Sequence, residues 1–326
     1  MNKSLRPPWF LRGAHRQTLV GHLLPGTRIG QPDRRYFVPL PDGDTLVLHE
    51  NLPRKWVPGG PMVLLIHGLT GSHDSGTIRR LAHQLCGANI ACQRLDMRGA
   101  GDGFALAKKS YNGGCSEDLD AAISHISKIH PGSRLGVMGV SLGANVALRL
   151  AGVLGEEAHT RFPNWCGLVA MNPPVDLGAC SRLLALPQNR LYESTFLKAL
   201  WKSETHRRVL LGKSSLHSGP GPTTLRQFDD MVTAPSWGFA NADAYYEWGS
   251  SIKLLPNVRV PGWVLTARDD PFVDHRPLEA LAPKTGALTI DIHDHGGHMG
   301  YLTWNRGFHR WAEPEMVGQM GQFLTK

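Results

Sequence analysis

From residue 61 onward the chain alternates strand patterns with helix patterns, and this alternation restricts the folds open to it more than any other feature. Residues 61–68, PMVLLIHG, form an apolar run that ends in glycine, which is typical of a strand buried on both faces. Residues 74–89 then place apolar side chains at helical intervals, with Gly87 as the expected C-cap. The alternation continues, with strands expected at 90–96, 134–140 and 166–172 and helices at 142–155 and at 116–130, the latter with Ser116 as N-cap. It predicts βαβ units, and therefore an α/β fold with a mostly parallel central sheet and helices on both faces.

Two segments break this rhythm and divide the chain. Residues 35–50 alternate apolar and polar side chains around the turn PDGD, so we expect a hairpin at the edge of the sheet. The second segment lies between the expected strand at 166–172 and the strand that begins GWVLTARDD. It contains proline, glycine and helical fragments without a further buried strand. We therefore expect three parts: a basic N-terminal arm (1–35), an α/β core (36–172 and 257–326), and an inserted helical cap (173–256) over the C-terminal edge of the sheet.

The cap segment from Tyr192 to Trp248 is rich in aromatic residues. We expect some of them to line an apolar pocket above the sheet. For any single aromatic residue, the alternative that it only forms the core of the cap itself is equally open.

Positive charge is concentrated in the arm. The chain has a formal net charge of +8, but outside the arm acidic and basic residues nearly balance. A charge this local does not indicate nucleic acid as a partner. The arm could instead make peripheral contact with anionic phospholipid head groups or bind acidic substrates. The remaining alternative is that it is only a solvated surface stretch. The arm has one acid, Asp33, against Lys3, Arg6, Arg12, Arg16, Arg28, Arg34 and Arg35.

The composition also bears on where the protein works. No apolar run approaches the roughly 20 residues that cross a bilayer, and proline and arginine interrupt the apolar residues of the arm before a signal-peptide core forms. The five cysteines include no C-x-x-C pair. We expect a cytoplasmic protein with reduced thiols.

The motif GVSLG at residues 139–143 lies between an expected strand and an expected helix, which is the context that the G-x-S-x-G pattern requires. A serine in so sharp a turn needs Gly139 and Gly143, because a Cβ at either position would collide with neighbouring backbone. The turn lifts the Ser141 hydroxyl above the sheet at the positive end of the new helix. Ser141 is therefore the candidate nucleophile.

A serine nucleophile also needs donors for the oxyanion of its tetrahedral intermediate. HGLTG at residues 67–71 ends the first central strand. The N–H of Leu69 is therefore expected to converge with the N–H of Leu142, the residue after the nucleophile.

A base for Ser141 is expected on the loop after the last strand, where the sequence reads IHDHGGHMG. His298 follows two glycines that let the backbone bend toward the nucleophile, so we predict it as the base. His293 and His295 share one strand face, but no third ligand stands at a typical zinc spacing, and a serine nucleophile needs no metal. We expect both to be strand-end residues and no metal in the site.

An acid must orient the imidazole of the base. TARDDPF follows the strand GWVL, and the position before Pro271 makes Asp270 the predicted acid, with Asp269 as the alternative. The resulting chain order of serine, aspartate and histidine is that of α/β-hydrolases.

The segment DMRGAGDG has glycines at alternate positions, which invites comparison with a dinucleotide-binding loop. The third glycine of that motif is not at the required offset, and no helix follows at once. We therefore expect a tight loop near the nucleophile and no cofactor.

Together these motifs resemble a known family, the YheT-like α/β-hydrolases, which are relatives of the abhydrolase-domain lipid hydrolases. The resemblance covers most of the chain and is carried by RPPWFLRGAHRQTL, LIHGLTGSHDS, DMRGAGDG, GVSLGANV, ARDDPF and GGHMGY. It implies an α/β-hydrolase fold, a triad of Ser141, Asp270 and His298, and esterase-type chemistry on acyl esters. Some relatives in this family act on phospholipids.

The sequence therefore predicts a serine hydrolase that cleaves carboxylic esters of small molecules, either lipids or short- to medium-chain esters, through an acyl-enzyme. One alternative is a hydrolase-fold binding protein with an inactive triad and the arm as its working surface. Another is an acyltransferase that uses the same triad. The sequence does not specify the acyl chain length or the oligomeric state.

Overall fold

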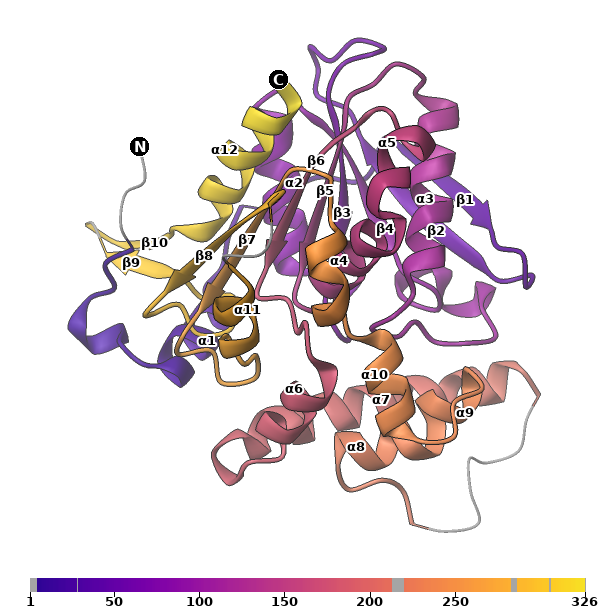
Figure 1. The fold of residues 1–326 in the computed structure, drawn as a ribbon, viewed down its shortest axis with the longest axis vertical. Helices are drawn as coiled ribbons and strands as arrows, with labels where there is room; N and C mark the ends of the chain where they lie inside the picture. The colour runs from indigo at the N-terminus through magenta and orange to yellow at the C-terminus, as the bar shows by residue number, and fades with distance from the viewer. Residues whose placement is uncertain (1–4, 28, 213–219, 283–285, 305, 326) are drawn as a thin grey trace.

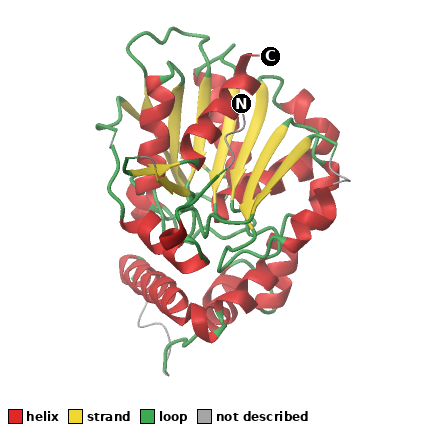
Figure 2. Cartoon of the chain, turned by 90° about the vertical axis from the view of Figure 1, so that its left-hand side faces the viewer, coloured by secondary structure: helices red, strands yellow, loops and turns green. Residues whose placement is uncertain are grey.

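The computed structural model describes residues 5–27, 29–212, 220–282, 286–304 and 306–325, and the large sheet at its centre has helices on both faces (Figure 1; Figure 2). The eight strands of the sheet lie in the order β1-β2-β4-β3-β5-β6-β7-β8. The first two pairings, β1 with β2 and β2 with β4, are antiparallel, and all the others are parallel. The predicted mostly parallel α/β sheet is thus confirmed. The strands are β1 (Arg34–Pro39), β2 (Thr45–Asn51), β3 (Met62–Ile66), β4 (Ala91–Asp96), β5 (Leu135–Val140), β6 (Trp165–Met171), β7 (Gly262–Ala267) and β8 (Leu288–His293).

The apolar run of β3 is buried because alternate side chains enter two different cores. Leu64 and Ile66 pack with the cluster on one face of the sheet, whereas Val63 and Leu65 pack with the cluster on the other. A central parallel strand that is covered on both sides has no face to give to polar residues. This is why an uninterrupted apolar sequence marks the middle of the sheet.

Helices cover both faces of this sheet. Residues of α2 and α12 enter the cluster with Val63, and residues of α3, α4 and α11 enter the cluster with Leu64. The core helices are α2 (Gly76–Gly87), α3 (Ser116–Ile129), α4 (Leu142–Leu154), α5 (Ala158–Arg161), α11 (Arg276–Leu281) and α12 (Ala312–Thr325), with short 3-10 turns η2 (Gly101–Leu106) and η3 (Gly155–Glu157).

Between β6 and β7 the described residues up to Gly249 form helices that gather at one end of the sheet (Figure 1), whereas Leu254 and Leu255 pack against α4 in the core. Residues 213–219 of the predicted cap lie outside the described residues. The elements are α6 (Leu177–Leu184), η4 (Pro187–Asn189), α7 (Arg190–Leu210), α8 (Leu225–Phe228), η5 (Asp229–Thr233), α9 (Ala234–Ser236), α10 (Ala242–Gly249) and η6 (Ile252–Asn257).

The arm contains η1 (Trp9–Leu11) and α1 (Ala14–Leu23), and it lies beside the hairpin of β9 (Leu302–Trp304) and β10 (Phe308–Arg310). Gln17 of α1 is fully buried, and its side chain pairs with both the N–H and the C=O of Leu302 at 2.7 and 3.2 Å. The alternative of a merely solvated arm is therefore wrong for α1. Among the described residues, no helix combines the length and the apolar character needed to span a bilayer.

Two predicted helix caps are wrong. Gly87 is the last residue of α2, and the left-handed backbone conformation occurs at Asn89, with a φ of 60°. Asparagine tolerates this conformation better than most residues, so glycine is not required there. Ser116 is the first residue of α3 rather than its N-cap, and its hydroxyl accepts a hydrogen bond from Arg149 of α4.

Candidate active site

Ser141 is the single residue that connects β5, which ends at Val140, to α4, which begins at Leu142. Its φ of 51° and ψ of −123° are strained for a residue with a side chain. A Cβ at Gly139 would lie 2.6 Å from the backbone of Ala144, and a Cβ at Gly143 would lie 2.4 Å from a backbone oxygen. Both glycines of the motif are therefore required by the turn that presents the serine.

His298 joins Ser141 to Asp270. The Nε2 atom of His298 lies 3.0 Å from Oγ of Ser141, and its Nδ1 atom lies 2.8 Å from Oδ2 of Asp270. An Nδ1 proton donated to the carboxylate leaves Nε2 free to accept from the serine hydroxyl. The structure thus brings together the three residues that the motifs selected from distant parts of the chain.

The Asp270 carboxylate is held from several sides. Its side chain has no solvent exposure, and its Oδ1 atom accepts the N–H groups of Phe272 and Val273 at 2.9 and 3.1 Å. Asn172 donates its Nδ2 to Oδ2 at 2.7 Å. With one oxygen occupied by backbone donors, only Oδ2 is left to face His298. The acid is therefore fixed in orientation as well as in place.

Asp269 points elsewhere. Its Oδ1 atom accepts the N–H of Gly297 at 2.8 Å, and its Oδ2 atom lies 3.4 Å from Nδ1 of His295. Asp269 thus holds the loop that carries His298 without contacting the imidazole. Of the two candidate acids, the structure sets Asp270 against His298.

His293 ends β8, as predicted, and its ring lies against Trp311 with centroids 4.7 Å apart. Its Nε2 atom lies 3.2 Å from the Asp291 carboxylate. His293 and His295 therefore contact different acids.

The loop that carries Leu69 touches the nucleophile. A Cβ at Gly68 would lie 3.0 Å from Cβ of Ser141, and Gly68 begins a turn closed by a 3.1 Å hydrogen bond from the N–H of Gly71. Leu142 starts α4, and the first N–H groups of a helix have no partner within the helix. The Leu69 side chain packs against the cluster that contains Leu142. The loop that carries Leu69 and the first residue of α4 thus both border Ser141.

His67 supports this loop from below. Its Nδ1 atom donates to the Gly68 carbonyl at 2.8 Å, and its Nε2 atom accepts the N–H of Met97 at 3.2 Å. Complete burial lowers the pKa of His67, which favours the neutral imidazole that these two bonds require. The hydroxyl of Tyr111 donates to the same Gly68 carbonyl at 3.3 Å.

Two residues that hold the site were not predicted. Thr18 of the arm accepts the backbone N–H of His298 with its Oγ1 atom at 2.9 Å. Asn172 binds both Asp270 and the Gly297 carbonyl, the latter at 3.3 Å. The only sequence signals were a polar residue directly after a buried strand, in the case of Asn172, and the polar pair QT within the arm. Neither signal predicts which distant residue the side chain contacts.

Aromatic rings connect the base to the cap. Phe272 lies 4.5 Å from the His298 ring, measured between centroids, and Tyr192 of α7 lies 4.7 Å from Phe272. His15 of the arm stacks on Tyr192, with its Nδ1 atom 3.2 Å from the hydroxyl. At least one aromatic residue of the cap therefore reaches the neighbourhood of the site.

Comparison with known proteins agrees with this architecture. The family model described as serine aminopeptidase, S33 (Hydrolase_4) matches residues 60–301. The monoacylglycerol lipase of Saccharomyces cerevisiae is 28% identical over 267 residues, which cover 78% of this chain and 58% of the lipase. YheT of Escherichia coli is 26% identical over 270 residues, which cover 81% of this chain and 77% of YheT. The chain thus spans less than two thirds of the length of the yeast relative.

Among solved structures, a 2,6-dihydroxy-pseudo-oxynicotine hydrolase has the same fold, with a TM-score of 0.61 and 16% sequence identity over 91% of this chain and 69% of that one. The family match covers most of the chain and includes Ser141, Asp270 and His298. The chain belongs to the serine aminopeptidase S33 family and is a YheT-like α/β-hydrolase.

Proposed function

We propose that this protein is a serine hydrolase that cleaves carboxylic esters, with Ser141 as nucleophile, His298 as base and Asp270 as the acid that orients it. The observation that carries the proposal is the unbroken series of hydrogen bonds from the serine hydroxyl through the imidazole to a buried carboxylate. A serine hydroxyl becomes a competent nucleophile when such a base removes its proton.

In the proposed reaction, Oγ of Ser141 attacks the acyl carbonyl while Nε2 of His298 takes the hydroxyl proton. The N–H groups of Leu69 and Leu142 bind the oxyanion, and the loss of one such donor costs about 3 kcal/mol in the transition state. The imidazolium then protonates the leaving alcohol as the C–O bond breaks. Water then gives a proton to the same imidazole and attacks the acyl-enzyme. The imidazolium returns the proton to Oγ as the carboxylic acid product leaves and Ser141 is regenerated.

The surroundings of His298 favour an apolar acyl group. Phe272 contacts the imidazole ring and belongs to an apolar cluster shared with α6, α7 and α8 of the cap. A substrate that reaches Ser141 next to these rings loses least on desolvation if its acyl chain is hydrocarbon. The name of the yeast relative, a monoacylglycerol lipase, supports lipid esters as the substrate class.

Labelling with a fluorophosphonate probe tests the nucleophile directly. We expect the folded protein to react with one probe molecule on the peptide that contains Ser141, and prior labelling to abolish hydrolysis of p-nitrophenyl esters. A series of such esters of increasing chain length then measures the acyl preference. A correctly folded protein that neither reacts with the probe nor hydrolyses any ester of the series would favour the binding-protein alternative.

We also infer that the arm contacts anionic membranes. Trp9, Phe10, Trp304 and Phe308 form a connected group of rings with centroid separations of 4.9–6.5 Å. Their exposed fractions are 77%, 38%, 51% and 39%. We call these four residues the arm patch. Exposed aromatic rings of this kind suit the interface of a bilayer.

Positive charge accompanies the arm patch. Arg12 and Arg16 are exposed on the arm, and Nη1 of Arg16 lies 3.4 Å from the Phe10 carbonyl. A basic side chain near an anionic membrane contributes about 1 kcal/mol of attraction. Rings and arginines together fit a phospholipid surface better than a protein partner, because they combine shallow apolar insertion with charge complementarity.

Sedimentation with lipid vesicles tests this contact. We expect the protein to bind phosphatidylglycerol vesicles more strongly than phosphatidylcholine vesicles, and added salt to weaken the binding. The double variant Trp9→Ala with Trp304→Ala is expected to lose most of it. Phe37→Ala, which removes a 59% exposed ring on β1, is the matched control and is expected to bind normally. Equal binding by the double variant and the parent protein would contradict the assignment.

A further inference from the structure

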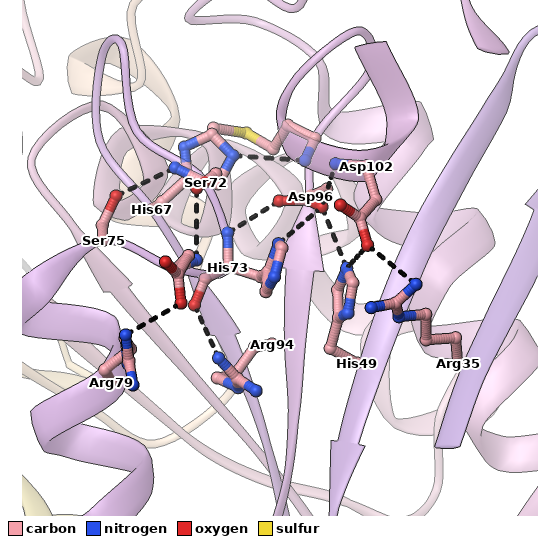
Figure 3. Close-up of polar contacts among 12 residues, drawn as sticks. Arg35, His49, His67, Ser72, His73, Ser75, Arg79, Arg94, Asp96 and Asp102 are labelled. Atoms are coloured by element: carbon pink, nitrogen blue, oxygen red, sulfur yellow. Dashed lines mark hydrogen bonds and ion pairs between the residues drawn. The ribbon is translucent and has the colours of Figure 1, made fainter. Parts of the chain in front are cut away.

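A second cluster of reactive side chains lies outside the Ser141 site. His49 is on β2, His73 is in the loop between β3 and α2, and Asp96 is the last residue of β4 (Figure 3). Their donor atoms, one from each residue, all lie within 4.8 Å of one another. The side chains of His49 and Asp96 are fully buried, and that of His73 is 14% exposed. Three separate segments thus bring two imidazoles and a carboxylate to one point.

Both imidazoles point at the same carboxylate oxygen. Nε2 of His49 and Nδ1 of His73 lie 2.9 and 2.8 Å from Oδ2 of Asp96, and the two rings stack with centroids 3.5 Å apart. One buried carboxylate oxygen thus receives a ring nitrogen from each of the two histidines.

Within the described part of the chain, no lysine or arginine forms an ion pair with Asp96. Arg94 lies close by in Figure 3, but its guanidinium donates to the side chain of Asn51 and to the carbonyl of His73, each at 3.0 Å. Asp96 also accepts the backbone N–H groups of His73 and Asp102, at 2.7 and 2.9 Å, so its two oxygens are held in place on several sides.

A fourth possible ligand atom, a carboxylate oxygen of the partly exposed Asp102, lies beside the cluster. Oδ2 of Asp102 lies 3.9 Å from Nε2 of His49, and this side chain is 40% exposed, with Arg35 at 3.3 Å on its outer side. Gly101 lies directly over the carboxylate: with a φ of 49°, a Cβ there would come within 2.2 Å of Oδ1 of Asp96. The loop therefore leaves this side of Asp96 free of any side chain.

We propose that His49, His73 and Asp96, with Asp102 as fourth ligand, bind a divalent transition metal, with Zn²⁺ as the best match. Two imidazole nitrogens with carboxylate oxygens are a donor set that Zn²⁺ accepts in tetrahedral geometry. Metal bonds of about 2.0–2.2 Å separate neighbouring ligand atoms by about 3.3 Å, so Oδ2 of Asp96 moves outward by a few tenths of an ångström. The two rings tilt so that their lone pairs converge, and the ion replaces their hydrogen bonds to Oδ2.

The proposed ion stabilises the chain around Asp96 and Met97, which supports the loop that carries Leu69, and it does not contact the reacting atoms. Asp96 is followed by Met97, whose N–H donates to His67, and His67 in turn holds the Gly68 carbonyl. The site is therefore structural, and its existence does not depend on the proposed ester hydrolysis.

Metal titration of the untagged, metal-depleted full chain tests the site. We expect calorimetry and elemental analysis to find one tightly bound Zn²⁺ per chain, with a rise in Tm on Zn²⁺ addition. Co²⁺ in the same site is expected to give the intense visible absorption of a four-coordinate ion. His73→Ala is expected to weaken Zn²⁺ binding at least tenfold and to abolish the rise in Tm.

His293→Ala is the matched control, because it removes another largely buried imidazole that faces a carboxylate. It is expected to bind Zn²⁺ like the parent chain. If circular dichroism shows that His73→Ala does not fold, Asp102→Asn, at a partly exposed position, is expected to weaken binding and change the Co²⁺ spectrum. A parent chain that binds neither Zn²⁺ nor Co²⁺ would overturn the proposal, as would a folded His73→Ala or Asp102→Asn variant that binds them unchanged.

Discussion

Ser141→Ala is expected to lower kcat for a p-nitrophenyl ester by about a million-fold, which is the scale seen when a serine hydrolase loses its nucleophile. Without Oγ no acyl-enzyme forms, and His298 has no hydroxyl from which to take a proton. Residual turnover then comes only from binding and from the oxyanion donors Leu69 and Leu142. Steady-state kinetics over a range of protein concentrations measures the effect.

Ser124→Ala is the matched control for this experiment, because Ser124 is an exposed serine on α3. It is expected to keep full activity and to react with the fluorophosphonate probe. The Ser141→Ala chain is expected to fold, because alanine has the same Cβ as serine in the strained turn. Substantial ester hydrolysis by the folded Ser141→Ala chain would refute the proposed nucleophile.

Asp270→Asn is expected to lower kcat by about 10⁴-fold with little change in KM. The two backbone N–H groups on Oδ1 keep an oxygen at that position, so the new amide nitrogen takes the place of Oδ2. That nitrogen is a hydrogen-bond donor, and it faces Nδ1 of His298. It also faces the side-chain amide of Asn172, which is a donor too, so the hydrogen bond from Asn172 is lost. The imidazole is then forced to carry its proton on Nε2, where it can no longer accept from Ser141.

Asp269→Asn provides the comparison at the neighbouring position. The Asp269 carboxylate accepts the N–H of Gly297, and an amide oxygen can accept it equally well. We therefore expect Asp269→Asn to stay within a few-fold of the parent kcat. The opposite ranking of the two variants would transfer the role of acid to Asp269.

The sequence predicted the fold and the arrangement around Ser141 well, because the relevant signals are local. An apolar run such as β3 requires cover on both faces, and G-x-S-x-G between a strand and a helix has few other structural solutions. The family resemblance and the predicted α/β fold are confirmed. Loops after parallel strands meet at one edge of the sheet, and for this reason His298 and either Asp269 or Asp270 could be proposed as partners of Ser141 from the loops in which they stand.

Contacts between distant segments, other than those expected around Ser141, were not predicted. Thr18 and His298 are 280 positions apart, and His49, His73 and Asp96 come from three different strands or loops. A single polar residue has many possible partners, and no periodic pattern selects one of them. The helix caps were predicted wrongly for a local reason, because the end of a helix depends on only one or two backbone angles. After α2 it is Asn89 that adopts the left-handed conformation expected of a glycine.

The packing of α1 against the His298 loop means that the proposed active site depends on residues outside the segment that the family model matches. The family match begins at residue 60, yet the N–H of His298 and both backbone groups of Leu302 are satisfied by Thr18 and Gln17. A chain that began at residue 60 would leave these groups without their partners, and we expect His298 to be held less firmly beside Ser141. Arg16, one of the two arginines proposed to meet the lipid surface, lies on the same helix, so we expect membrane binding to alter the position of the His298 loop.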